Sequence, residues 1–301
     1  MATTIDQAFI KQFEREVHEA FQRQGSKLRN TVRVINNVNG SEAVFQKVGK
    51  GTASTKSTHG MVPVMNLDHS AVTATLQDFY AGDWVDKLDE LKINIDERQI
   101  IANAGAYALG RKADEMIITK LASVGAGQEI ADGNVGITLD KVLEALTMLG
   151  DADVPDGGER YAIVGWKQWS ELLKINEFAS ADFVGPDELP FRATMQAKRW
   201  LGSLWIPHSG LPVDSSDIRS CFWYHKSAIG HAAAADVTTD ITWHGDRAAH
   251  FVNNMMSQGS ALIDATGVVE IKCDETPDCS CRLIPTSSYK GADTCVLVQQ
   301  T

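Results

Sequence analysis

The chain has 301 residues, of which 44% are hydrophobic and 22% charged, and it carries a formal net charge of -11 at pH 7. These fractions are typical of a folded globular protein, while the acidic balance argues against sequence-specific nucleic-acid binding, which needs a concentrated basic surface. No apolar stretch reaches the roughly 20 residues of a membrane span, and residues 1–10 lack the pattern of a signal peptide.

Residues 4–24 are predicted to form an amphipathic helix that ends near Gly25. Large apolar side chains recur near the helical period, with charged residues between them: Ile5, Phe9, Phe13, Val17 and Phe21. A helix with one apolar face needs a partner surface. We therefore assign Phe9 and Phe13 to an assembly interface.

Two strand-like segments, 31–38 and 41–48, follow on either side of Asn39-Gly40. This dipeptide tolerates the positive φ angles of a tight turn, so the pattern predicts a β-hairpin formed by the two segments.

Residues 49–59 consist largely of Gly, Thr, Ser and Lys and hold almost no apolar side chain. They cannot join a core, so we expect them to project from the body, with the chain returning through a strand at 71–76. An exposed ribbon of this kind is marginal in isolation, and it is usually retained only where a neighbouring molecule covers it.

Residues 96–122 give the strongest helix signal. Asp96 can cap the helix, and Gln99 lies at the capping-box distance. One side of the helix is expected to carry Ile101, Ala104, Gly105, Ala108, Lys112 and Met116. At about 1.5 Å per residue this helix spans roughly 40 Å, the size of a small domain.

The rest of the chain is predicted to be mixed α/β. Helices are expected at 138–149 and 166–173 and near 248–256, strands at 160–165, 222–224 and 267–271, and a turn-rich stretch at 177–220. Six tryptophans of this region are interpreted as core residues: Trp166, Trp169, Trp200, Trp205, Trp223 and Trp243.

The cysteines allow one alternative to free thiols. Cys273, Cys279, Cys281 and Cys295 are four in number, as a zinc site requires, but their spacing matches no common zinc module. Free thiols are the preferred interpretation. Cys221 with His225 is the candidate pair for a hydrolase, a hypothesis that sequence proximity supports only weakly. We therefore expect no enzymatic activity and no cofactor.

The order of these elements resembles the Hong Kong 97-type major capsid proteins of tailed bacteriophages over roughly residues 1–272. The segments that carry the resemblance are Ile95-Asp96-Glu97-Arg98-Gln99, Ala108-Leu109-Gly110-Arg111-Lys112-Ala113-Asp114, the region 143–164, IPHSGLP at 206–212, 224–229, and GSALIDATGVVEI at 259–271. The implied fold is α+β, with an N-terminal arm, an extended β-hairpin loop, a peripheral domain with a long spine helix, and an axial α/β domain.

The resemblance implies six regions along the chain. They are an arm and hairpin start at 1–44, the extended loop at 45–84, the peripheral domain with its spine helix at 85–137, the axial domain at 138–235, a peripheral return at 236–272, and a C-terminal extension at 273–301. The extension departs from the family pattern.

The resemblance also implies self-assembly into pentamers and hexamers of an icosahedral shell around double-stranded DNA. Expected partners are scaffolding, portal and decoration or cement proteins, with only non-specific proximity to DNA and no membrane. The expected location is the virion, after assembly in the host cytoplasm. An encapsulin-like nanocompartment shell is the alternative.

Charged residues are expected to set the register between subunits. The basic candidates are Arg29, Arg33, Lys50 and Lys56, and we expect them to pair with acidic residues such as Asp86 and Asp89 of a neighbour.

Overall fold

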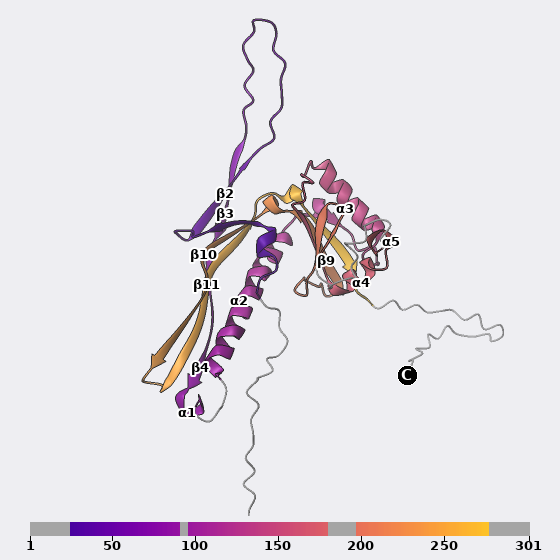
Figure 1. The fold of residues 1–301 in the computed structure, drawn as a ribbon. Helices are drawn as coiled ribbons and strands as arrows, with labels where there is room; N and C mark the ends of the chain where they lie inside the picture. The colour runs from indigo at the N-terminus through magenta and orange to yellow at the C-terminus, as the bar shows by residue number, and fades with distance from the viewer. Residues whose placement is uncertain (1–24, 91–95, 180–196, 277–301) are drawn as a thin grey trace, which may run out of the picture.

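The computed structural model describes residues 25–90, 96–179 and 197–276. Within these ranges the chain forms an elongated part, built on a four-stranded sheet and a long helix, and a compact part built on a six-stranded sheet (Figure 1). We call them the peripheral part and the axial part. The mixed helix-and-sheet architecture agrees with the predicted α+β class.

The peripheral sheet has the strand order β1-β10-β11-β4. Its strands are β1 (Arg33–Asn36), β10 (Ile229–His244), β11 (Ala249–Leu262) and β4 (Gln77–Asp86), and β4 leads into the short helix α1 (Lys87–Glu90). β10 and β11 form a long antiparallel hairpin, whereas β1 is parallel to β10. Segments from three distant regions of the sequence therefore share this sheet.

Helix α2 (Glu97–Leu121) confirms the long helix predicted at 96–122. The Asp96 side chain caps it by accepting a hydrogen bond from the Gln99 N–H. The side chosen from sequence faces the sheet, since the Lys112 ammonium lies over the Phe79 ring. A second side is fully buried, and sequence reasoning missed it: Leu109, Gly110, Ala113, Asp114, Ile117, Ile118 and Leu121.

The prediction that residues 49–59 project from the body is confirmed. Strands β2 (Glu42–Val48) and β3 (His69–Thr75) pair antiparallel, and the Gly49 N–H continues their ladder to the Asp68 carbonyl. Beyond Lys50, whose ammonium contacts Asp153, the chain stands clear of the body (Figure 1). Only the root of the hairpin is buried, with Phe45 packed in a small apolar cluster on the peripheral sheet.

The predicted hairpin between 31–38 and 41–48 is wrong. The chain does turn at Gly40, where φ is +122°, but β1 pairs with β10 and β2 pairs with β3. The dipeptide Asn39-Gly40 determines only the local bend. The partner of each flanking strand depends on residues far away in the sequence.

The axial sheet has the order β5-β12-β9-β6-β8-β7. Its strands are β5 (Glu129–Ile130), β12 (Val268–Asp274), β9 (Ile218–His225), β6 (Arg160–Val164), β8 (Ser203–Pro207) and β7 (Lys198–Trp200). The helices of the axial part are α3 (Leu139–Asp151), α4 (Trp166–Leu172) and α5 (Asn176–Ala179). Short 3-10 helices occur along the described chain at η1 (Arg29–Thr31), η2 (Ala126–Gln128), η3 (Lys226–Ala228) and η4 (Ala265–Gly267). The helices and strands predicted at 138–149, 160–165, 166–173, 222–224 and 267–271 are thereby confirmed.

Aromatic side chains fill the axial core. Trp205 contacts Trp200, Trp223 and Phe178 with ring centroids 5.2–6.5 Å apart. Two of the buried indole N–H groups have acceptors, since Trp205 donates to the Trp200 carbonyl and Trp223 to the Ser203 hydroxyl. Four of the six tryptophans predicted as core residues are therefore confirmed: Trp169, Trp200, Trp205 and Trp223. The prediction is wrong for Trp166 and Trp243, which are 49% and 44% exposed.

The helix predicted near 248–256 is wrong, because these residues belong to strand β11. Val252, Asn254 and Met256 are buried alternately with partly exposed neighbours, as in a strand with two unlike faces. The segment pairs with β10 on one side and β4 on the other. Two flanking strands impose the extended conformation on a sequence without a strong preference of its own.

Candidate functional site

Two of the charged residues predicted for the assembly interface, Lys56 and Asp86, lie at opposite ends of the subunit. Lys50 and Lys56 belong to the extended loop, where both are exposed, whereas Asp86 ends strand β4 beside α1 (Figure 1). The Asp86 carboxylate accepts a hydrogen bond from the Leu88 N–H. Asp89 lies in α1, and its side chain is outside the described residues, as are Phe9 and Phe13.

Three of the basic candidates have partners within their own chain. Arg29 forms an ion pair with Asp236 at 2.6 Å, and the Lys50 ammonium lies 2.8 Å from an Asp153 oxygen. The Arg33 guanidinium lies over the Phe45 ring, 5.8 Å from its centroid. Among the described residues these charges are thus at least partly satisfied before any neighbour is added.

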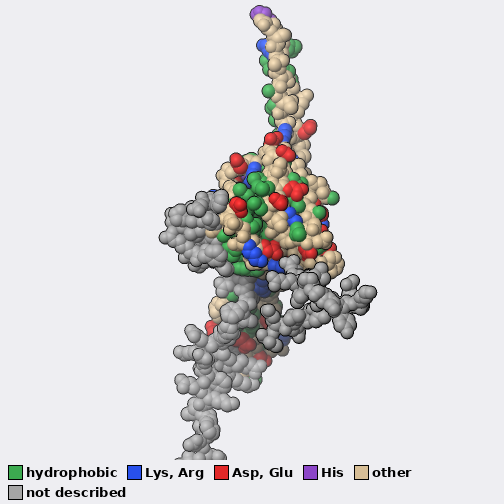
Figure 2. Space-filling model, turned by 90° about the vertical axis from the view of Figure 1, so that its right-hand side faces the viewer, with side chains coloured by type: hydrophobic (Ala, Val, Ile, Leu, Met, Phe, Trp, Pro, Cys, Tyr) green, Lys and Arg blue, Asp and Glu red, His purple; other side chains and the backbone are tan. Residues whose placement is uncertain are grey.

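Apolar side chains on the returning arm of the loop are exposed. Met61 is 95% exposed, Val62 74% and Val64 81%, and Met65 and Leu67 are also partly in solvent. Figure 2 shows hydrophobic side chains along the loop, far from the rest of the subunit. A run of exposed apolar side chains on one thin element is unusual for a surface that meets only water.

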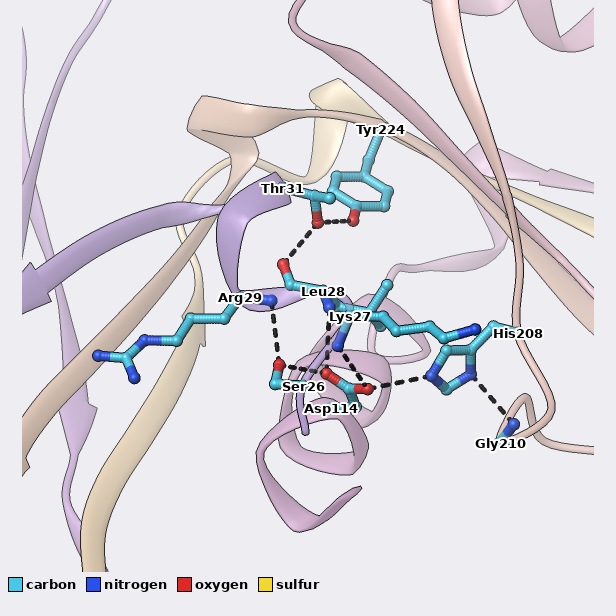
Figure 3. Close-up of polar contacts among 9 residues, drawn as sticks. All are labelled: Ser26, Lys27, Leu28, Arg29, Thr31, Asp114, His208, Gly210 and Tyr224. Atoms are coloured by element: carbon cyan, nitrogen blue, oxygen red, sulfur yellow. Dashed lines mark hydrogen bonds and ion pairs between the residues drawn. The ribbon is translucent and has the colours of Figure 1, made fainter. Parts of the chain in front are cut away.

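A buried polar junction joins the start of the described chain to both parts of the subunit (Figure 3). We call residues 25–32 the arm root. Asp114 of α2 is fully buried, and its Oδ1 accepts hydrogen bonds from the Ser26 hydroxyl at 2.5 Å and the Leu28 N–H at 3.1 Å. Its Oδ2 accepts from the Lys27 N–H at 3.1 Å and lies 3.2 Å from the His208 Nε2.

The network assigns the tautomer of His208. Its Nδ1 accepts a hydrogen bond from the Gly210 N–H, so the ring proton is on Nε2 and is donated to Asp114. Burial raises the pKa of Asp114, but the hydrogen bonds from His208, Ser26 and the two backbone N–H groups outweigh burial and hold this pKa below its usual value. The carboxylate is therefore kept ionised inside the protein.

A second contact holds the arm root to the axial sheet. The Thr31 hydroxyl donates to the Leu28 carbonyl at 2.7 Å, so the Tyr224 O–H is the donor in the 2.5 Å contact between Thr31 and Tyr224. Burial raises the pKa of the Tyr224 phenol, which therefore keeps the proton that it donates. Leu28 itself is fully buried in the axial core.

Sequence reasoning did not identify Ser26, Asp114, His208 or Tyr224 as a group. One signal was present, because Asp114 is a carboxylate on the otherwise small and apolar buried side of α2. A charge in such a position needs several donors nearby. Its partners could not be named from the sequence, because they come from two distant segments, the arm root and the chain after β8.

The hypothesis of a zinc site at the terminal cysteines finds no support in the one member that the structure describes. Cys273 is fully buried on β12. A hydrogen bond with Cys221, followed by burial, raises the pKa of its thiol, so Cys273 is held in the protonated form that binds metals poorly. Cys279, Cys281 and Cys295 lie outside the described residues. In the described part of the chain, no three metal-ligating side chains come together.

The pair proposed for a hydrolase does not form an accessible site. Cys221 is fully buried in β9, and the His225 Nδ1 is engaged with Ser227. A nucleophile must reach its substrate, so this geometry gives the hydrolase hypothesis no support. No helix in the described ranges is long and apolar enough to cross a membrane.

Comparison with known proteins agrees with this architecture. The model of the family described as phage capsid protein matches residues 5–275, nearly the whole chain. The chain belongs to the phage capsid protein family. It is accordingly a structural protein of the phage head, and the match favours this role over an encapsulin-like shell. A search of curated protein sequences finds no significant match.

Solved structures share the fold at low sequence identity. A chain from Mycobacterium phage Che8 is 19% identical with a TM-score of 0.69, and the similarity covers 89% of this chain and 98% of that one. A chain from the capsid of cyanophage P-SCSP1u is 16% identical with a TM-score of 0.67, and the similarity covers 92% of this chain and 96% of that one. A chain from the capsid of a native GTA particle is 15% identical with a TM-score of 0.66, and the similarity covers 88% of this chain and 96% of that one. These similarities confirm the Hong Kong 97-type fold.

Proposed function

We propose that this capsid protein assembles as pentamers and hexamers into a closed icosahedral shell that encloses double-stranded DNA. The observation that carries the proposal is the extended loop, whose apolar side chains have no core to join within the subunit. Burying one such side chain contributes about 1.5–3 kcal/mol, so a neighbour that covers several of them would be bound firmly. Obligate assemblies of this kind bury several thousand Å² per subunit, as an order of magnitude.

The positions of the interface charges support contacts between subunits. Lys56 on the loop and Asp86 beside α1 are at opposite ends of one chain, so they meet only if different copies meet. Interface charges of this type select register and partner more than they add affinity. Asp89, Phe9 and Phe13 complete the proposed interface set.

The net negative charge of the chain supports a shell that binds the enclosed DNA only weakly. A wall that paired with phosphates would release counterions and hold DNA tightly. Figure 2 shows acidic and basic side chains interspersed on the visible face of the axial part, without a continuous basic patch there. Proximity to packaged DNA in the virion, with scaffolding, portal and decoration or cement proteins as partners, follows from this role, as does assembly in the host cytoplasm.

Electron microscopy of the full-length chain, with and without its scaffolding protein, tests the proposal. Closed shells are expected from the wild-type chain, and sedimentation should show particles of megadalton size. The variant with Met61→Ser and Val64→Ser should fold but give few closed shells, because the loop loses its apolar contacts. The matched control Thr55→Ser, in the same loop, should assemble normally. Compact monomers from the wild-type chain under all conditions would contradict the proposal.

A further inference from the structure

The arm root lies between the two parts of the subunit and is bonded to both. Toward the peripheral part, Ser26 is bound to Asp114 of α2 and Arg29 to Asp236 of β10. Toward the axial part, Thr31 is bound to Tyr224 of β9. One segment of eight residues thus connects helix α2 to one strand of each of the two sheets.

The contacts at Asp114 leave the arm root little freedom. The carboxylate takes donors from three successive residues, Ser26, Lys27 and Leu28, and a fourth from His208, and each donor has a preferred direction. Hydrogen bonds to a buried charged group are stronger than ordinary ones. Rotation of the arm root would leave a carboxylate without its donors in a buried site, which is costly.

The backbone of the arm root also touches α2 directly. A Cβ atom placed on Gly110 would lie 2.7 Å from the Gly25 carbonyl carbon and 2.8 Å from its Cα. No real Cβ approaches backbone so closely, so the contact requires glycine at position 110. Glycine in a helix interior costs about 1 kcal/mol relative to alanine, and the close approach explains why the helix carries it.

We propose that Gly110 and Asp114 are positioning residues for assembly: they fix the direction in which the chain before Gly25 leaves the subunit, relative to both parts. Through His208 and Tyr224 this direction is coupled to the arrangement of the axial part. The inference rests on the proposed function, because direction matters only if residues 1–24 contact another copy. A closed shell tolerates only certain angles between copies, so a loosened arm root alters closure.

The sharpest test compares two alanine substitutions of helical glycines. Gly110→Ala brings a side chain against the arm root, whereas Gly150→Ala in α3 meets nothing within 4 Å. Both substitutions raise helix propensity, Gly110→Ala in the interior of α2 and Gly150→Ala in the last turn of α3, and a gain in propensity by itself cannot loosen the arm root. Any difference between the two variants therefore reports the contact with Gly25 and not the helix itself.

Two measurements on the full-length chain decide the outcome. In the unassembled subunit, hydrogen exchange of the Lys27 and Leu28 amides should become at least roughly tenfold faster in Gly110→Ala, the change expected when charge-assisted hydrogen bonds open more often. Under assembly conditions this variant should give fewer closed shells and a broader range of diameters. Gly150→Ala should match the wild type in both measurements.

A second pair of substitutions, at Ser26, tests the proposal if Gly110→Ala does not fold. Ser26→Ala removes the hydroxyl that binds Asp114, while Ser26→Thr retains it. The alanine variant should show the faster exchange and the altered shells together with a modest fall in melting temperature, and the threonine variant should recover all three. A residue with a merely structural role would change the melting temperature without changing the shell diameter.

The outcomes separate the two proposals. Normal exchange and shells of wild-type diameter from Gly110→Ala, or from Ser26→Ala where the former does not fold, would overturn this inference alone. Shells altered equally by Gly150→Ala would also overturn it, because the effect would not depend on the arm root. Failure of the wild-type chain to form any shell would overturn the proposed function and this inference with it.

Discussion

The axial core and the extended loop differ in how much of their apolar surface the subunit itself covers. In the axial core Trp205 and Trp223 are fully buried, whereas on the loop Met61 is 95% and Val64 81% exposed. The stability of the core is therefore a property of the single chain. The apolar surface of the loop can contribute only after a second molecule covers it, so the two regions should respond to substitution in opposite ways.

The largest effect on the free energy of unfolding is expected in the axial core. Trp205→Ala removes a fully buried ring and its hydrogen bond to the Trp200 carbonyl. We expect a loss of about 3–5 kcal/mol, measured by chemical denaturation of the unassembled subunit. The control is Trp166→Ala, at a side chain that is 49% exposed, which should cost much less. Equal losses would show that the two tryptophans are not distinguished by burial.

The next effect is expected at the junction between the two parts. Asp114→Asn should lower the free energy of unfolding by about 2–3 kcal/mol at pH 7, because the buried donors lose a charged acceptor. The folded-state pKa of Asp114 is below its usual value, so its contribution is present above the unfolded-state pKa and is lost as the pH falls through the folded-state pKa.

Denaturation from pH 7 down to the acid limit of the fold tests the sign of this dependence. The difference between wild type and Asp114→Asn should be constant near neutral pH and should shrink only in acid, below the usual carboxyl range. A difference that grows as the pH falls would contradict the assignment of Asp114 as an ionised acceptor.

A smaller effect on the free energy of unfolding is expected at the ion pair between Arg29 and Asp236, because both side chains are partly exposed to solvent. Arg29→Glu should cost about 0.5–1 kcal/mol, with an effect that weakens in high salt. The double variant Arg29→Glu with Asp236→Arg should recover both stability and assembly if the pair acts within one chain. Recovery of stability without assembly would instead show that Arg29 also serves a neighbouring subunit.

The smallest effect on stability, with the largest effect on assembly, is expected in the loop. Replacing residues 50–67 by Asn-Gly joins Gly49 to Asp68, which already face each other in the ladder, through a two-residue turn. The melting temperature should stay within a few degrees of wild type, because the removed residues bury almost nothing. Closed shells should be absent in electron micrographs. A variant that cannot fold, or one that assembles normally, would remove the distinction between the two regions.

Elements with local causes were predicted correctly from the sequence. The long helix followed from Asp96 and from a run of helix-favouring residues, and the loop followed from a composition that cannot form a core. The order of the elements was sufficient to identify the family. In each case the interacting residues are close together in the chain, so their chemistry can be read without coordinates.

Elements with distant causes required the tertiary structure. Strand β1 lies beside β10, about 200 residues further along, and β11 is extended because two other strands flank it. The bond between Ser26 and Asp114 spans 88 residues, and that between His208 and Asp114 spans 94. The sequence by itself determined where the long helix and the exposed loop lie, because those preferences act within a few residues. Only the folded chain decided which strands pair and where a buried charge finds its donors, since both depend on which distant residues come into contact.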